Sequence, residues 1–257
     1  GFVTHRRGLL AGASVGCLIG CQPAFAWWSA TGMETPLLML LLSTMTVGVL
    51  SGRHLVVGIA GGLAAMTRPE GPIYLLAGVF WILLEAKESE FSNRRLLGYL
   101  AIGVAPLACW HAFRLLEYQA LLANSALAKL APASIEPSVG TFRRALLYLN
   151  EGLWRLPATW SLSLVAALIA LRRYLRDGVV ARRWVYGGLL AGLTVVFVFI
   201  AGGDWMPWTR FFVPVAPSMV LLAIDELFDG VSGAMGRDLR LGLLLAMILA
   251  VVTLQVR

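Results

Sequence analysis

Nine long apolar runs, separated by short polar segments, follow one another along this chain. A helix needs about 20 apolar residues to cross the hydrocarbon core of a bilayer, within a range of roughly 17 to 25. Several runs are shorter, which is tolerated where a span faces other helices or lines a cavity. The pattern predicts an all-α, polytopic transmembrane helix bundle of about nine spans, forming a single domain over residues 1–257. The expected spans are Gly8–Ala26, Pro36–Ser51, His54–Thr67, Gly71–Glu85, Leu96–Phe113, Pro157–Arg172, Trp184–Ala201, Phe211–Phe228 and Leu239–Val256.

The composition excludes most other classes of protein. Of the 257 residues, 59% are hydrophobic and 14% are charged, and the mean hydropathy is +0.78. Soluble domains carry roughly 25% charged and 45–50% apolar residues, and one soluble core of this size could not hide so much apolar surface. A soluble enzyme, a disordered chain and a disulfide scaffold are therefore not expected. The three cysteines lie inside apolar runs without metal-ligand spacing to the histidines, which predicts buried thiols and neither a metal site nor a cofactor.

The basic residues indicate an orientation. The 21 Lys and Arg residues, which dominate a net charge of +7, occur in short groups between apolar runs, so nucleic-acid binding is not predicted. If the first span runs outward, most of them fall on one side, and the loop Arg172–Arg183 is the clearest case. The positive-inside rule places that side in the cytoplasm. The sequence thus predicts a multi-pass protein of the inner (plasma) membrane.

The longest loop on the predicted outer side covers residues 114–156. It is too polar and broken to span the bilayer but is rich in Leu and Ala, which is typical of one or two amphipathic helices at the outer interface. The N-terminus leaves an alternative open, because Arg6-Arg7 before an apolar stretch that ends in Ala24-Phe25-Ala26 also fits a secretory signal. Since eight further spans follow, a plain first helix is the favoured interpretation.

Four polar groups lie on the predicted outer side, where polar residues at membrane depth are functional candidates. The first, Trp27–Pro36, contains Glu34, which is either a site carboxylate or a charge at a helix start with Thr35 as the cap. The third, Phe113–Lys129, has the hydrophobic pattern of an interfacial helix whose basic residues extend toward the headgroups.

The second and fourth groups combine charges with helix-breaking residues. Thr67–Pro72 contains Arg68 and Glu70, which form either a turn with a local ion pair or a guanidinium placed to bind phosphate in a bidentate manner. The fourth group follows a pair of glycines, which let the backbone turn tightly and let another group approach closely. It holds Asp204 and Arg210 with two tryptophans between them, and forms either an interfacial ion pair or part of a site.

At these four groups the chain resembles the polytopic, lipid-linked-sugar glycosyltransferases of the GT-C class, in the bacterial branch related to terminal arabinofuranosyltransferases. That branch carries S-G-x-E-T before an apolar span, and Ser29–Pro36 reads S-A-T-G-M-E-T-P. It carries T-R-P-E-G, identical to Thr67–Gly71, and a stretch that Arg114–Lys129 matches loosely. It also carries G-G-D-x-M-x-x-x-R-F-x-x-P, matched by Gly202–Pro214. The order is the same, and the resemblance covers residues 27–217.

The resemblance implies an enzyme that moves a sugar from a polyprenyl-phosphate donor to a polysaccharide, lipid or protein acceptor of the cell envelope, on the outer side of the bilayer. A carboxylate would act as general base on the acceptor hydroxyl, and cationic groups would stabilise the leaving phosphate. The residues placed in a catalytic role are Asp204 and Glu34, and those placed in substrate binding are Arg68, Glu70, Asn124, Lys129, Trp205 and Arg210.

Two departures from the family pattern affect this interpretation. The third group has Glu117-Tyr118-Gln119 and Ala123-Asn124-Ser125 where the family has Y-Y-G and P-N-T. GT-C enzymes also carry a catalytic aspartate in the first outer loop, which is expected upstream of Gly1, so the N-terminal part is expected to be missing from this chain. The alternatives are a transporter or flippase of lipid-linked sugars and a non-catalytic fragment of such an enzyme.

Overall fold

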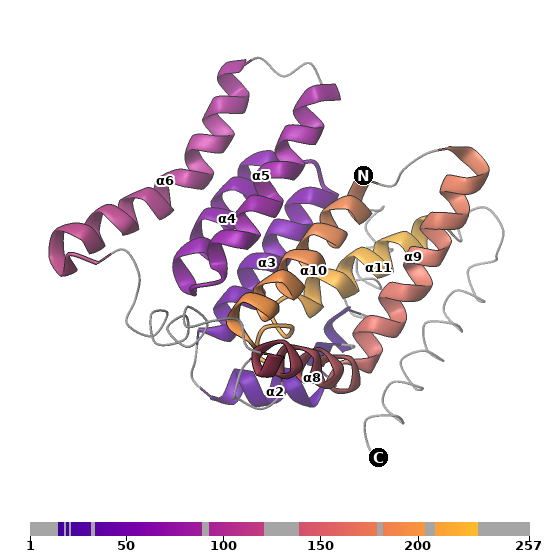
Figure 1. Ribbon diagram of the computed structural model, residues 1–257. Coiled ribbons are helices and arrows are strands. Elements are labelled where there is room, and N and C mark those ends of the chain that lie inside the picture. Colours follow the sequence, from indigo (N-terminus) through magenta and orange to yellow (C-terminus); the bar gives the residue numbers. More distant parts are fainter. Residues whose placement is uncertain are drawn as a thin grey trace.

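A computed structural model (Figure 1) describes residues 15–17, 19–20, 22–31, 34–88, 93–120, 139–178, 182–203 and 209–230. These residues form helices joined by turns, without a strand among them, which confirms the all-α class. The helices are α2 (Pro23–Ala30), α3 (Thr35–Leu50), α4 (His54–Thr67), α5 (Gly71–Glu88), α6 (Asn93–Tyr118), α8 (Val139–Arg155), α9 (Pro157–Asp177), α10 (Arg182–Ala201) and α11 (Ala216–Gly230).

Most apolar runs become helices close to their expected bounds, but two expected spans are interrupted. The first is broken at Gln22, whose extended backbone (φ −87°, ψ 120°) precedes Pro23, and proline disfavours helical geometry in the residue before it. The eighth begins with a turn over residues 210–215, and α11 starts only at Ala216 because Pro214 and Pro217 bracket the start of that helix. The run Leu239–Val256 lies outside the described residues.

Two of the described helices are long and apolar enough to cross a membrane. These are the segment Arg94–Tyr118 of α6 and Arg182–Ala201 of α10. A third crossing is obtained if α8 and α9, which are bent by 85° relative to each other, are counted as one broken span. Only 6% of the apolar window of α6 is fully buried, because this helix packs on α4 along one side and is exposed along much of the rest.

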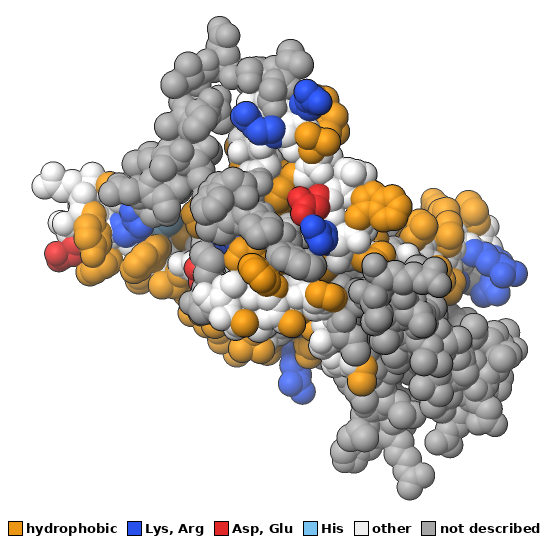
Figure 2. All heavy atoms as spheres, turned by 90° about the horizontal axis from the view of Figure 1, so that it is seen from below, with side chains coloured by type: hydrophobic (Ala, Val, Ile, Leu, Met, Phe, Trp, Pro, Cys, Tyr) orange, Lys and Arg blue, Asp and Glu red, His pale blue; other side chains and the backbone are white. Residues whose placement is uncertain are grey.

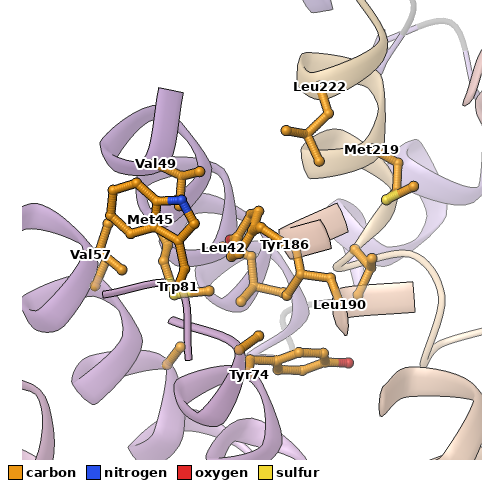
Figure 3. Close-up of a cluster of buried hydrophobic side chains, with 14 of the residues drawn as sticks. Leu42, Met45, Val49, Val57, Tyr74, Trp81, Tyr186, Leu190, Met219 and Leu222 are labelled. Carbon is orange, nitrogen blue, oxygen red and sulfur yellow. The ribbon is translucent and has the colours of Figure 1, made fainter. Parts of the chain in front are cut away.

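The central core lies between α3, α4, α5, α10 and α11 (Figure 3). Leu42 and Met45 from α3 meet Trp81 from α5 and Leu190 from α10, and all four are buried. A polar contact lies within this core, between the hydroxyl groups of Thr46 and Tyr186 at 3.2 Å. Because apolar side chains fill the centre, the charged groups of these helices are left at their ends.

Glycines on facing helices bring α4 and α6 into close contact. A Cβ atom at Gly62 would collide with the carbonyl oxygen of Gly103, and one at Gly58 would lie 2.9 Å from that of Tyr99. Gly58 and Gly62 are four residues apart, the small-xxx-small spacing that lets transmembrane helices pack backbone to backbone. This signal in the sequence favours helix association in a bilayer and was not among the motifs singled out above.

The polar ends of the helices gather at two ends of the molecule. An ion pair between Arg182 and Glu85 (3.5 Å) joins the start of α10 to the last turn of α5, so these two helix ends meet at one end of the molecule. The other end holds the α4–α5 turn, the start of α3, and α2 and α8, which lie side by side at the bottom of Figure 1. The candidate site lies at this second end.

Candidate functional site

A buried arginine, Arg68, joins three segments of the chain. Its Nη2 lies 2.6 Å from a carboxylate oxygen of Glu70, and its Nη1 donates a hydrogen bond of 3.0 Å to the hydroxyl of Thr35. Its Nε lies 3.6 Å from a carboxylate oxygen of Glu34, which is too long for a hydrogen bond. The side chains of Arg68 and Glu70 are 1% and 2% exposed, whereas that of Glu34 is 39% exposed, so Glu34 is the member of this cluster that solvent reaches.

The sequence of the α4–α5 turn explains why Arg68 and Glu70 are held here. Arg68 ends α4 in an extended conformation (φ −147°, ψ 156°), as expected before Pro69. Its carbonyl accepts a hydrogen bond of 2.8 Å from the N–H of Gly71, which starts α5. A Cβ at Gly71 would collide with the carbonyl oxygen of Ala64, so only glycine lets the two helices turn this tightly. The predicted ion pair of this turn is therefore present, and it is buried.

Aromatic rings connect Arg68 to a second buried arginine. The Cζ of Arg210 lies 6.0 Å from the ring centre of Trp28 and 5.5 Å from that of Phe211. The Cζ of Arg68 lies 5.9 Å from the same Phe211 ring. These distances are within the range of cation–π attraction, which is larger in a desolvated site. Phe211 therefore contacts two buried guanidinium groups, one from each of two distant motifs.

Helix α8 covers this end of the molecule through the two glycines after α10. Both glycines have positive φ angles, +68° at Gly202 and +86° at Gly203. A Cβ at Gly202 would lie 2.7 Å from the Cγ2 of Thr141, and one at Gly203 would lie 3.3 Å from the Cβ of Tyr148. The hydroxyl of Tyr148 accepts a hydrogen bond of 2.9 Å from the N–H of Phe211. The group for which the glycine pair makes room is thus α8.

The structure brings together three of the four predicted groups. Glu34 from the first, Arg68 and Glu70 from the second and Arg210 from the fourth lie around Thr35 and Phe211. In the third group, residues up to Tyr118 continue α6, and the guanidinium of Arg114 lies over the ring of Trp110 in the same helix. Asn124, Lys129, Asp204 and Trp205 lie outside the described residues.

Several residues of the cluster were not predicted to belong to it. Thr35 was expected to cap α3 but is its first residue, and Glu34 occupies the cap position without a side-chain capping bond. The buried hydroxyl of Thr35 is turned to Arg68 instead. Tyr148 and Phe211 look like ordinary apolar residues in the sequence, and nothing in their local pattern indicates the pairing. Within the described ranges, acidic, histidine and cysteine side chains form no group that could hold a metal ion.

The cluster contains the elements of a site for a hydroxylated, anionic ligand. An exposed carboxylate can accept a proton from a hydroxyl group, and buried guanidinium groups favour a developing negative charge because their charge is only weakly screened there. The Nε of Arg68 is buried without a hydrogen-bond acceptor. A ligand oxygen that accepts from Nε and lies beside Glu34 would remove that deficit.

Comparisons of the chain with protein-family models, with curated proteins and with solved structures give no match.

Proposed function

We propose that this chain is part of a membrane glycosyltransferase of the GT-C type, which transfers a sugar from a polyprenyl-phosphate donor to a cell-envelope acceptor. The proposal includes the polytopic topology of about nine spans in the plasma membrane, with the candidate site on the outer side. The observation that carries it is the convergence of Glu34, Arg68 and Arg210 at one end of an apolar helix bundle. These residues come from three motifs that are far apart in the sequence and match the family pattern in order.

In this proposal the exposed Glu34 takes the proton of the acceptor hydroxyl. The 3.6 Å separation from Nε of Arg68 leaves the carboxylate oxygens of Glu34 open to a hydroxyl donor. Asp204 is a second carboxylate candidate by its place in the fourth motif, next to Arg210 in sequence.

The guanidinium groups of Arg68 and Arg210 are assigned to the phosphate of the donor. Arg68 already carries two carboxylate neighbours, so a phosphate reaches it from the side of Glu34, the exposed partner. Glu70 then keeps Nη2 in place while Nε turns to the phosphate oxygen. Trp205, Asn124 and Lys129 are assigned to the sugar and the phosphate by their positions in the motifs.

The test starts with binding and then measures transfer. The purified chain in detergent is incubated with a polyprenyl-phosphate pentose and, in parallel, with the matching uncharged polyprenol, and bound lipid is counted by native mass spectrometry. We expect the phosphate-linked lipid to bind and the polyprenol not to bind. Transfer of radiolabelled sugar to an envelope extract follows. Equal binding of both lipids would contradict the assignment of the arginines to phosphate, and binding without transfer would favour a transporter or a non-catalytic fragment over an active transferase.

A further inference from the structure

Helix α8 runs almost at right angles to the helix that follows it. The two are bent by 85° relative to each other, on either side of Leu156. Exposed leucines cover the outside of α9, with Leu164 61%, Leu168 56% and Leu171 50% exposed, as expected for a helix in contact with lipid. If α9 follows the membrane normal, α8 has to lie along the membrane plane.

The side chains of α8 include a buried stripe, an exposed apolar flank beside it and a charged flank on the other side. A buried stripe at helical spacing packs on the protein and consists of Thr141, Ala145, Tyr148 and Gly152. With 3.6 residues per turn, Phe142, Leu146 and Leu153 share one flank beside this stripe. They are 57%, 46% and 57% exposed. The opposite flank carries Arg144, Glu151 and Arg155, and the face that points away from the bundle carries Arg143, Asn150 and two exposed apolar side chains, Leu147 (59%) and Trp154 (76%).

We propose that α8 is an interfacial helix whose apolar flank (Phe142, Leu146 and Leu153) lies in the headgroup region of the bilayer. An amphipathic helix with an exposed apolar strip and arginines beside it binds at the boundary between headgroups and acyl chains. Arg143 and Arg155 are exposed and basic, which matches the anionic lipids of a bacterial-type membrane surface. The face seen from below (Figure 2) shows hydrophobic side chains exposed close to Lys and Arg side chains.

A bilayer is a better occupant of this flank than a second protein chain. Large exposed apolar side chains lie on both helices, on either side of the bend, so the lipid that covers α9 can also cover this flank. In water, by contrast, three large apolar side chains in a row would be left exposed without compensation. The proposal concerns the lipid contact alone and does not depend on sugar transfer.

The contact has a consequence for the candidate site. The hydroxyl of Tyr148, on the buried stripe of α8, accepts a hydrogen bond from the backbone N–H of Phe211. The ring of Phe211 in turn contacts the guanidinium groups of Arg68 and Arg210. Binding of α8 to the interface therefore sets the depth of the two guanidinium groups at the level of the lipid headgroups.

The experiment compares two positions on opposite flanks of α8. The cysteines at positions 17, 21 and 109 are replaced by alanine, and Leu146→Cys and Arg144→Cys are made separately in the full chain and labelled with an environment-sensitive fluorophore. Each protein is reconstituted in vesicles of phosphatidylcholine and phosphatidylglycerol that carry nitroxide lipids, with the nitroxide either near the headgroup or near the end of the acyl chain. We expect the Leu146→Cys label to have blue-shifted emission and to be quenched more by the shallow nitroxide. The Arg144→Cys label, on the charged flank, should be quenched by aqueous iodide.

Three results would overturn the proposal. Stronger quenching of the Leu146→Cys label by the deep nitroxide would make α8 part of a broken span. Quenching by iodide equal to that at Arg144→Cys would place the flank in water. No quenching by either nitroxide or by iodide would mean that protein covers it. If Leu146→Cys does not fold, Phe142→Cys replaces it on the same flank and is subject to the same three results.

Discussion

Two clusters of arginines and carboxylates lie at opposite ends of the bundle, and they are built in opposite ways. Helix α10 begins at Arg182, beside the cluster of Arg173, Arg183, Asp225 and Glu226, and ends at Ala201, toward the cluster of Arg68. We call these the inner and the outer cluster, after the proposed topology. In the outer cluster a buried arginine, Arg68, is surrounded by carboxylates, one of which is exposed. In the inner cluster a buried carboxylate, Glu226, is surrounded by donors that are partly exposed.

In the inner cluster both carboxylate oxygens of Glu226 have N–H donors. One carboxylate oxygen of Glu226 lies 2.8 Å from Nη1 of Arg173. The other accepts a hydrogen bond of 3.2 Å from the indole N–H of Trp184 and lies 3.1 Å from Nε of Arg183. Arg183 also pairs with Asp225. The side chain of Glu226 is fully buried, whereas those of Arg173 and Arg183 are 40% and 19% exposed. These contacts tie α9 and α10 to α11.

The outer cluster is less complete. Nε of Arg68 has no hydrogen-bond acceptor and its nearest carboxylate, Glu34, is 3.6 Å away and 39% exposed. A cluster in which every polar atom is satisfied serves to hold helices together, whereas a deficit at a buried donor leaves room for a ligand atom. Both clusters are charged, and they differ in whether a buried donor lacks a hydrogen-bond acceptor. That difference marks the outer cluster as the candidate site and the inner cluster as structural.

The largest effect is expected at the inner cluster. Glu226→Ala removes the buried acceptor of two arginines and a tryptophan, so we expect a loss of about 3–5 kcal/mol in the free energy of unfolding. Glu85→Ala is the control, because the Arg182–Glu85 pair is 43% and 27% exposed and should change stability by less than about 1 kcal/mol. Unfolding of both proteins in detergent by titration with SDS measures the difference. Equal stability of the two variants would show that the inner cluster does not stabilise the packing of α9, α10 and α11.

Arg68→Lys is expected to have a smaller but still clear effect on stability. Lysine carries a point charge and cannot reach Thr35 and Glu70 together in the planar arrangement that the guanidinium uses. A buried acceptor left unpaired costs about 1–3 kcal/mol. The exposed Arg155→Lys on α8 is the matched control. The same SDS titration applies, and binding of the polyprenyl-phosphate pentose should be lost in Arg68→Lys alone. Unchanged lipid binding would mean that Arg68 does not contact the phosphate and only stabilises the turn.

The link between α8 and the outer cluster is tested by Tyr148→Phe. The ring contacts with Phe211 and Phe212 are kept, at 5.7 and 5.8 Å between ring centres, and the acceptor of the Phe211 N–H is removed. We expect a loss of about 1 kcal/mol in the free energy of unfolding. Amide hydrogen exchange at residues 209–215 should become faster, while exchange in the inner cluster stays the same. Equal exchange at residues 209–215 would mean that the hydrogen bond does not hold this segment.

The sequence predicts the helices well and the site only in part. Apolar runs bounded by proline, glycine and charges place α4 within its observed bounds and identify T-R-P-E-G as a turn with an ion pair. The partners of Arg68 could not be predicted to the same extent. Thr35 and Phe211 are far from Arg68 in the sequence, and their side chains carry no sign of a long-range contact. The inner cluster could not be predicted either, because Asp225 and Glu226 lie within an apolar run and their arginine partners are far away in the sequence.

The smallest effect on stability is expected at the residue with the largest proposed role in catalysis. Glu34 is 39% exposed and is not within hydrogen-bond distance of Arg68. Glu34→Gln should therefore change the free energy of unfolding by less than about 1 kcal/mol. A general base contributes about 10²–10⁴ to the rate, so sugar transfer should fall by at least about tenfold. Glu151→Gln on α8 is the matched control, since its side chain is also 39% exposed and paired with one arginine, Arg155.

The two glutamates are thus alike in exposure and in the kind of partner, and they differ in whether that partner is buried. Arg155 is 45% exposed, whereas Arg68 is 1% exposed. A charge developing beside Glu34 therefore interacts with a guanidinium that water does not screen, whereas one beside Glu151 does not. Transfer and unfolding are measured on the same preparations of both variants. If both variants transfer sugar equally well, the deficit at Arg68 is a feature of the turn, and the difference between the two clusters no longer marks a site.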